Sequence, residues 1–179
     1  MRTPLAARAS LATLVTLGLA ALVAACAATR DTREPGEKLG TFAVNGALLG
    51  TTCGKAAPTF RYEVRLSREG NTLNWAQGST VPVTGTIDER GGVHMVAELD
   101  VVVTKADERA GVFGCTMHRT DTLSATLQGE PPTSFTGALV YRFSAKAGDC
   151  AGQLASAGGD FATLPCTMTY DVKAAALGQ

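Results

Sequence analysis

The feature that most constrains this chain is a two-residue hydrophobic period, which recurs throughout the sequence after Gly40. A period of two puts the apolar side chains on one face of a β-strand, and no segment after Gly40 has a convincing helical period of 3.6. The sequence therefore predicts a domain that is almost entirely β. The clearest alternation is found in residues 60–67, 81–88, 122–127, 135–143 and 164–172.

Turn-forming residues separate these segments. Glycine, asparagine, aspartate and proline cluster at residues 69–71, 88–92 and 129–132. Short strands at regular spacing with such turns are typical of a β-sandwich or a β-barrel. We expect an antiparallel meander of about eight strands.

Glycines inside the alternating segments favour a barrel over a sandwich. Gly46, Gly85 and Gly137 each precede a branched aliphatic residue by two positions, on the same strand face. Glycine weakens a strand, so its recurrence suggests sharp bends or close packing, as in a small coiled barrel. We expect a small barrel of lipocalin-like size, with a sandwich as the alternative.

Charge and composition exclude some classes of protein. The chain carries 16 basic and 16 acidic residues and 45% hydrophobic residues. Its sequence pI is near 6.7. A disordered chain has fewer apolar residues and a larger net charge. Without a net positive charge the protein has no strong field to attract phosphates, so we expect no nucleic-acid partner.

The N-terminus has the three parts of an export signal. Arg2 and Arg8 are followed by an apolar run at residues 11–23 and then by the small residues Ala24 and Ala25 before Cys26. This order resembles the signal peptide and lipobox of a bacterial lipoprotein. The resemblance implies that residues 1–25 are removed and that Cys26 is lipidated. An uncleaved membrane anchor is the alternative, since residues 9–29 carry no charge.

The resemblance also implies a location. Ala27 follows the lipidated cysteine, where an aspartate favours retention in the inner membrane of double-membraned bacteria. We therefore expect lipid anchoring in the outer membrane, on the periplasmic side or at the cell surface. The charged segment that follows, with Pro35 and Gly36, holds too little apolar surface to fold. We expect residues 26–39 to form a flexible tether and residues 40–179 a single β domain.

Four cysteines remain after Cys26, an even number that predicts two disulfides in an exported domain. Metal binding fits poorly because no Cys-x-x-Cys pair is present. Cys150 and Cys166 bracket most of an Ala-, Gly- and Ser-rich loop at residues 145–161, which favours a bond between them. Cys53 would then pair with Cys115, although four cysteines permit three connectivities.

Motifs for catalysis are sparse. The chain has no nucleophile elbow of the Gly-x-Ser-x-Gly type, no phosphate-binding loop and no dinucleotide fingerprint. His94, Glu98 and Asp100 share one face of a predicted strand, where they could act as acid and base or bind a cation. The same row is also what the solvent face of an amphipathic strand looks like. We expect no cofactor and no bound metal.

Aromatic residues supply a candidate binding surface. Tyr62, Trp75, Tyr141 and Phe143 fall mostly on the apolar faces of their strands, as does Tyr170. Eight strands enclose a volume that either is filled by side chains or holds one small ligand. These four residues are the candidate ligand-facing set, and a solid core is the alternative.

Together these features predict a membrane-anchored envelope lipoprotein with a noncatalytic binding or scaffolding β domain. Its partners would be the membrane, through the lipid, and an envelope protein or a small apolar ligand. The alternative is an envelope hydrolase or metal-dependent enzyme that uses the row of His94, Glu98 and Asp100.

Overall fold

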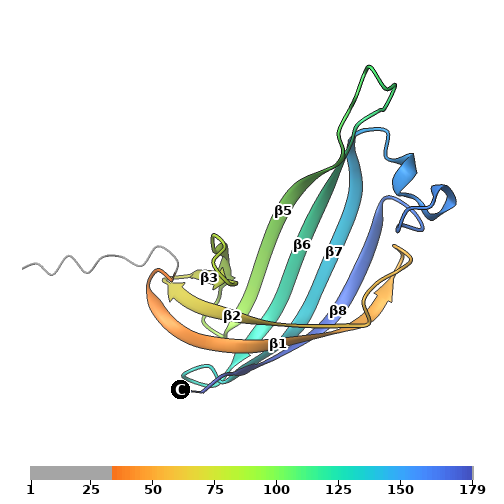
Figure 1. Ribbon diagram of the computed structural model, residues 1–179. Helices are drawn as coiled ribbons and strands as arrows, with labels where there is room; N and C mark the ends of the chain where they lie inside the picture. Colours follow the sequence, from red (N-terminus) through yellow and green to blue (C-terminus); the bar gives the residue numbers. More distant parts are fainter. Residues whose placement is uncertain (1–33, 179) are drawn as a thin grey trace, which may run out of the picture. The chain divides into compact units, whose positions relative to one another are not determined.

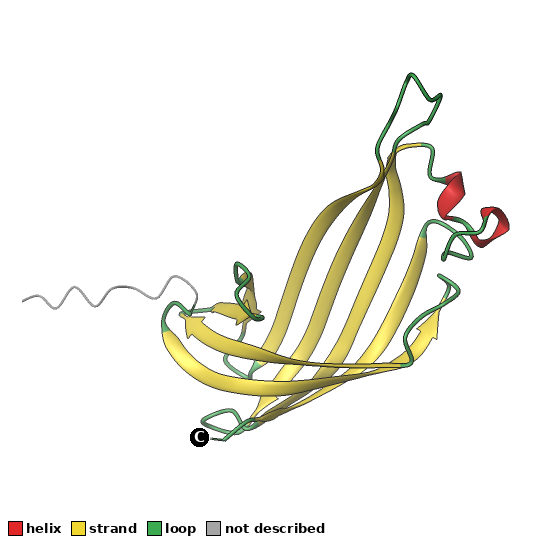
Figure 2. Ribbon diagram, in the orientation of Figure 1, coloured by secondary structure: helices red, strands yellow, loops and turns green. Residues whose placement is uncertain are grey.

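The computed structural model describes residues 34–178, which form eight antiparallel strands closed into a barrel (Figure 1). Each strand pairs with the next, and the last pairs with the first, which confirms the predicted meander and barrel. Only two short 3₁₀ helices interrupt the β structure of this part of the chain (Figure 2). The strands are β1 (Glu37–Thr51), β2 (Thr59–Glu69), β3 (Thr72–Ala76), β4 (Val83–Ile87), β5 (Gly92–Thr104), β6 (Cys115–Gln128), β7 (Ser134–Gly148) and β8 (Cys166–Ala176).

The two ends of the barrel differ in their connections. Short turns at residues 70–71, 88–91 and 129–133 join the strands at one end, here called the turn end. Long connections join them at the other end, here called the mouth end. These connections are residues 52–58, 77–82, 105–114 and 149–165, and the last contains the 3₁₀ helices η1 (Ala151–Gln153) and η2 (Ala155–Ala157). No helix among the described residues is long and apolar enough to cross a bilayer.

The β domain begins earlier than the expected boundary at residue 40. Strand β1 starts at Glu37, and Leu39 is buried in the core. Before the strand, Glu34 accepts a hydrogen bond of 2.5 Å from Nε of Arg65 on β2. The last six residues of the predicted tether are therefore part of the folded domain. Burial of the Leu39 side chain in the core and the hydrogen bond between Glu34 and Arg65 hold them there. Cys26, the expected signal segment and the rest of the tether lie outside the described residues.

The larger core cluster fills the barrel from the turn end to its middle, and a smaller cluster around Cys115, Met117 and Cys150 lies at the mouth end. Alternate residues of each strand point inward, as the two-residue period predicts. The rings of Phe42 and Phe135 meet at the centre with their centroids 5.6 Å apart. The largest side chains that are almost fully buried are Phe42, Phe135, Leu66, Leu73, Val44, Val64 and Val172.

Two of the singled-out glycines lie in one row across the sheet. Gly46 pairs with Phe60 on one side and Val172 on the other, and Val172 also pairs with Gly137. A β-carbon at Gly46 would lie 2.1 Å from the ring of Phe60, and one at Gly137 would lie 2.2 Å from the carbonyl oxygen of Ser124. Gly137 therefore excludes any side chain because backbone atoms occupy the space, whereas a side chain at Gly46 would require the Phe60 ring to move. Both glycines let the strands coil tightly around the core.

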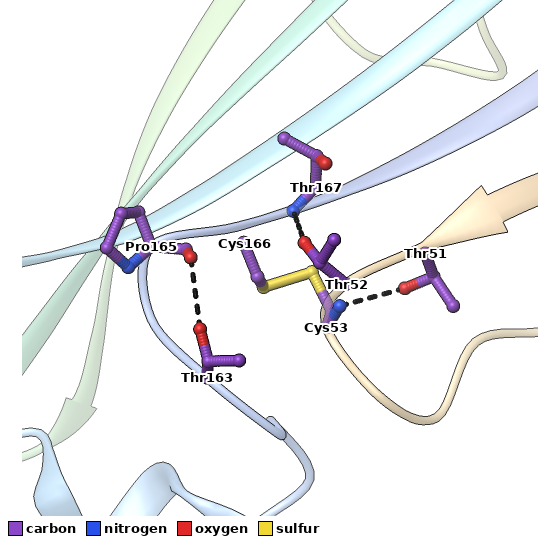
Figure 3. Close-up of a disulfide and its surroundings, with 7 residues drawn as sticks. All are labelled: Thr51, Thr52, Cys53, Thr163, Pro165, Cys166 and Thr167. Atoms are coloured by element: carbon purple, nitrogen blue, oxygen red, sulfur yellow. Dashed lines mark hydrogen bonds between the residues drawn. A yellow bond between two sulfur atoms is a disulfide. The ribbon is translucent and has the colours of Figure 1, made fainter.

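Two disulfides are present, but the expected pairing is wrong. Cys53 is bonded to Cys166, and Cys115 is bonded to Cys150. Thus the predicted bonds Cys150–Cys166 and Cys53–Cys115 do not form. Figure 3 shows the first bond beside the hydrogen bond of 2.9 Å that the backbone N–H of Thr167 donates to the hydroxyl of Thr52.

The closure of the barrel explains this pairing. Strands β1 and β8 are neighbours, and Thr51 pairs with Met168, so Cys53 just beyond β1 meets Cys166 at the start of β8. Cys115 pairs with Gly148 across β6 and β7, which brings Cys150 within reach two residues later. Both disulfides staple the mouth end, and the first one fixes the seam that closes the barrel.

Candidate functional site

A cavity of ≈ 470 Å³ occupies the half of the barrel nearest the mouth end. Its position follows from the shortness of β3 and β4. Residues 59–64 of β2 pair only with β1, and residues 96–104 of β5 pair only with β6. No strand of the described chain therefore continues the wall between β2 and β5 at this height (Figure 1). The lining residues are Phe60, Tyr62, Trp75, Gln77, Thr80, Val83, Met95, Ala97, Arg119, Asp121, Leu123, Leu139, Tyr141 and Tyr170.

Three of the four candidate ligand-facing residues line this cavity. Tyr62, Trp75 and Tyr141 come from β2, β3 and β7, and the fold brings them together around one space. Phe143 is not a lining residue. It lies two positions further along β7 and packs against Phe161 of the β7–β8 connection, with their ring centroids 5.4 Å apart.

Aromatic rings form much of the cavity wall. Phe60 stacks on Tyr62 with a centroid distance of 5.4 Å and contacts Tyr170 at 5.0 Å. Tyr170 meets Tyr141 edge-on at 5.8 Å, and Tyr62 meets Trp75 edge-on at 6.2 Å. These contacts join rings from β2, β3, β7 and β8 into one surface, which holds each ring in place before any ligand arrives.

A charged pair on β6 projects into the same cavity. Arg119 donates a hydrogen bond of 2.6 Å from Nε to Asp121 and a second one from its Nη2 atom to the other carboxylate oxygen. The guanidinium carbon also lies 4.7 Å from the centroid of the Tyr141 ring. The hydrogen bond to the Asp121 carboxylate raises the pKa of Arg119 above its ordinary value, so the guanidinium is charged at neutral pH.

Sequence reasoning missed this pair, although the alternation contained the signal. Leu123, Ala125 and Leu127 are the inward residues of β6, and extending their phase by two and four positions reaches Asp121 and Arg119. Charged side chains in the interior phase of a strand are costly unless they are paired. Such a departure from the pattern marks a site.

Two phenols of the cavity, those of Tyr62 and Tyr141, remain uncharged at neutral pH. Burial raises the pKa of Tyr62 and of Tyr141 above the usual value for tyrosine, with the nearby Asp121 carboxylate adding to both shifts. The hydroxyl of Tyr170 donates a hydrogen bond of 3.0 Å to the carbonyl oxygen of Ala57. Neither the Tyr62 nor the Tyr141 hydroxyl has a hydrogen-bond partner among residues 34–178. Both can therefore bind a ligand.

The row of His94, Glu98 and Asp100 lies on the outer face of β5, away from the cavity. His94 contacts the hydroxyl of Ser124 at 3.3 Å, whereas Asp100 contacts His118 at 2.7 Å and also Lys146. The hydrogen bond from Lys146, followed by that from His118, lowers the pKa of Asp100. Within residues 34–178, no three His, Cys, Asp or Glu side chains are grouped so that they could hold a metal ion.

Several apolar side chains of the mouth half are exposed. Val81 in the β3–β4 connection is 87% exposed, and Phe113 in the β5–β6 connection is 76% exposed. Leu49 near the end of β1 and residues 101–103 of β5 are also exposed. The β5–β6 connection carries exposed charged side chains as well, at Lys105 and at residues 107–109.

No protein-family model matches the chain, and no curated protein or solved structure is significantly similar to it.

Proposed function

We propose that this protein is an envelope lipoprotein, anchored through Cys26, whose barrel binds a small molecule and performs no chemistry on it. The observation that carries this proposal is the cavity of ≈ 470 Å³. Its volume is within the range of small-molecule sites, and its lining combines apolar rings with a few polar groups, as such sites do. The unpartnered hydroxyls of Tyr62 and Tyr141 support the same conclusion.

The proposed lipid would be joined to the barrel on the side of the turn end. Glu37, the first residue of β1, pairs with Arg68 close to the β2–β3 turn, so the chain enters the barrel at the turn end. Seven residues separate Cys26 from Glu34, a span of at most about 26 Å if extended.

The proposal of a noncatalytic role rests on where the candidate acid–base groups lie. The Asp121 carboxylate inside the cavity is held by Arg119, and the row of His94, Glu98 and Asp100 is on the outer surface. If the purified protein has a hydrolytic turnover that is lost on His94→Ala or Glu98→Ala, the enzyme interpretation replaces this one.

Two experiments test the proposal separately. For anchoring, wild type and Cys26→Ser are compared for incorporation of labelled palmitate; equal incorporation contradicts the lipid anchor.

For binding, the neutral dye N-phenyl-1-naphthylamine is titrated into the exported chain that begins at Ala27. All eight strands, both disulfides and the core lie within this form.

Trp75 reports on the binding experiment because it is the only tryptophan and lines the cavity. Binding in the cavity should quench its emission and transfer energy to the dye. Trp75→Phe keeps an aromatic wall and removes the signal, while Phe143→Leu changes a ring outside the cavity and should leave the titration unchanged. Unaltered Trp75 fluorescence with no gain in dye emission contradicts the binding function.

A further inference from the structure

We infer that the cavity selects amphipathic molecules without net charge, whose one polar group both donates and accepts hydrogen bonds at Arg119 and Asp121. This inference rests on the proposed binding function and adds the chemical class of the ligand. It follows from the charges, donors and acceptors that the cavity presents.

The charges inside the cavity cancel. Among its lining residues, Arg119 is the one basic side chain and Asp121 the one acidic side chain, and they are bonded to each other through both carboxylate oxygens. Burial raises the pKa of Tyr62 and of Tyr141, so these two phenols add no charge. An empty cavity of this kind has no net charge for a ligand to neutralise.

The hydrogen-bonding groups are of both types. Arg119 uses two of its five N–H groups on Asp121, and the others remain as donors. The carboxylate of Asp121 keeps free lone pairs as acceptors, and the hydroxyls of Tyr62 and Tyr141 can donate or accept. A hydroxyl, phenol or amide on the ligand can donate a hydrogen bond to Asp121 and accept one from Arg119 at the same time.

A charged ligand would bind less favourably to the same groups. An anion that approaches Arg119 also approaches Asp121, from which it is repelled, and it loses its hydration in a partly enclosed space. A cation that approaches Asp121 meets Arg119 in the same way. The stacking of Arg119 on Tyr141 and its bonds to Asp121 prevent it from turning away to serve an anion alone.

The remainder of the ligand must be apolar. Phe60, Trp75 and Tyr170 present ring surfaces, and Met95, Leu123 and Leu139 close the floor toward the packed core. Transfer of the apolar part of the ligand from water into the cavity supplies most of the binding free energy, because an uncharged polar group contributes little.

The test uses two dyes that share one ring system and differ in charge. N-phenyl-1-naphthylamine is neutral and carries one N–H group, whereas 1-anilinonaphthalene-8-sulfonate adds a fixed negative charge. Both are titrated into the exported chain that begins at Ala27, with Trp75 quenching and dye emission as readouts. We expect the neutral dye to bind at least about tenfold more tightly, the size of effect that a single nearby charge has on an ionisation equilibrium.

Two variants test whether the pair of Arg119 and Asp121 causes the difference in affinity between the two dyes. Asp121→Asn leaves a net positive cavity and should shift the affinity ratio toward the sulfonate by about tenfold, while Arg119→Gln should shift it the other way. Asp88→Asn removes the same charge from a turn at the opposite end of the barrel and should leave the ratio unchanged. Far-UV circular dichroism confirms that each variant is folded.

The outcomes separate this inference from the proposed function. Tighter binding of the sulfonate by wild type overturns the charge selectivity and leaves the binding function intact. A ratio that neither Arg119→Gln nor Asp121→Asn changes also overturns it, because the pair would then not be the discriminating element. Failure of both dyes to affect Trp75 overturns the binding function and this inference together.

Discussion

The two halves of the barrel have the same strand pattern but different interiors. At the turn end, inward positions hold Phe42, Leu73 and Phe135, and the side chains fill the space. At the mouth end, the same phase of the strands holds Arg119 and Asp121 around a cavity. Packing of a large core stabilises the first half, whereas a smaller apolar cluster and two disulfides stabilise the second.

This difference shows how a small barrel can bind without losing its fold. The short strands β3 and β4 reach only through the packed half, and they leave the upper wall between β2 and β5 without a strand. A cavity there deprives the mouth half of buried apolar contacts, which are the main source of stability in the other half. The disulfides Cys53–Cys166 and Cys115–Cys150 both lie where that loss occurs.

The largest expected effect is on the disulfides of the mouth half. Replacing Cys53 and Cys166 by alanine should lower the free energy of unfolding by about 5 kcal/mol, because that bond joins residues separated by 113 positions. Replacing Cys115 and Cys150 should lower it by about 4 kcal/mol, since their separation is 35 positions. Urea unfolding of the two double variants measures both values, and the reverse order would contradict the loop-closure explanation.

The next effect compares one phenylalanine from each half. Phe42→Ala removes a fully buried ring that packs on Phe135 and should cost about 3–5 kcal/mol of unfolding free energy. Phe60→Ala removes a partly exposed ring at the cavity wall and should cost about 1–2 kcal/mol. Equal losses in urea unfolding would show that the mouth half is as well packed as the turn end.

A smaller effect is expected at the charged pair. Asp121→Leu should destabilise the protein by about 1–2 kcal/mol, because it leaves Arg119 without its partner in a partly enclosed space. The double variant Arg119→Leu with Asp121→Leu should be within about 1 kcal/mol of wild type, since apolar side chains replace both charges. Thermal unfolding of the two variants measures the difference. If the double variant is as unstable as the single one, the pair itself stabilises the fold and this explanation is wrong.

The smallest effect is a pH dependence that differs between the two ends. At the turn end, Asp88 accepts hydrogen bonds of 2.8 Å from the backbone N–H groups of Gly92 and Arg90, which lower its pKa. At the mouth end, Lys146 and then His118 lower the pKa of Asp100. A carboxyl with a lowered pKa in the folded state adds stability above its unfolded pKa, near about 4, and loses it as the pH falls through the folded value.

Asp88→Asn and Asp100→Asn should therefore differ from wild type in melting temperature at neutral pH and converge with it in acid. Salt separates the two ends, because about 1 M salt screens the exposed pair of Asp100 with Lys146 and leaves the backbone bonds of Asp88 in place. A mouth-end contribution that persists in high salt would contradict this assignment.

Much of the fold could be predicted from local pattern. The alternation around Tyr62 and Leu66 assigned strands and inward faces, because a strand buries one face and exposes the other. The same phase found three of the cavity residues, Tyr62, Trp75 and Tyr141. It also contained Arg119 and Asp121, which were overlooked because polar residues in a strand ordinarily mark its solvent face.

The sequence by itself determined that this chain forms about eight antiparallel strands with one apolar face, since side-chain period and turn residues act over a few positions. It favoured a barrel but left a sandwich open. Only the tertiary structure decided that β1 pairs with β8 and that Cys53 therefore bonds to Cys166, 113 positions away. It also decided that short β3 and β4 leave room for a cavity beside Arg119. Contacts between distant segments depend on how the sheet closes, and the closure of the sheet cannot be predicted from a local sequence pattern.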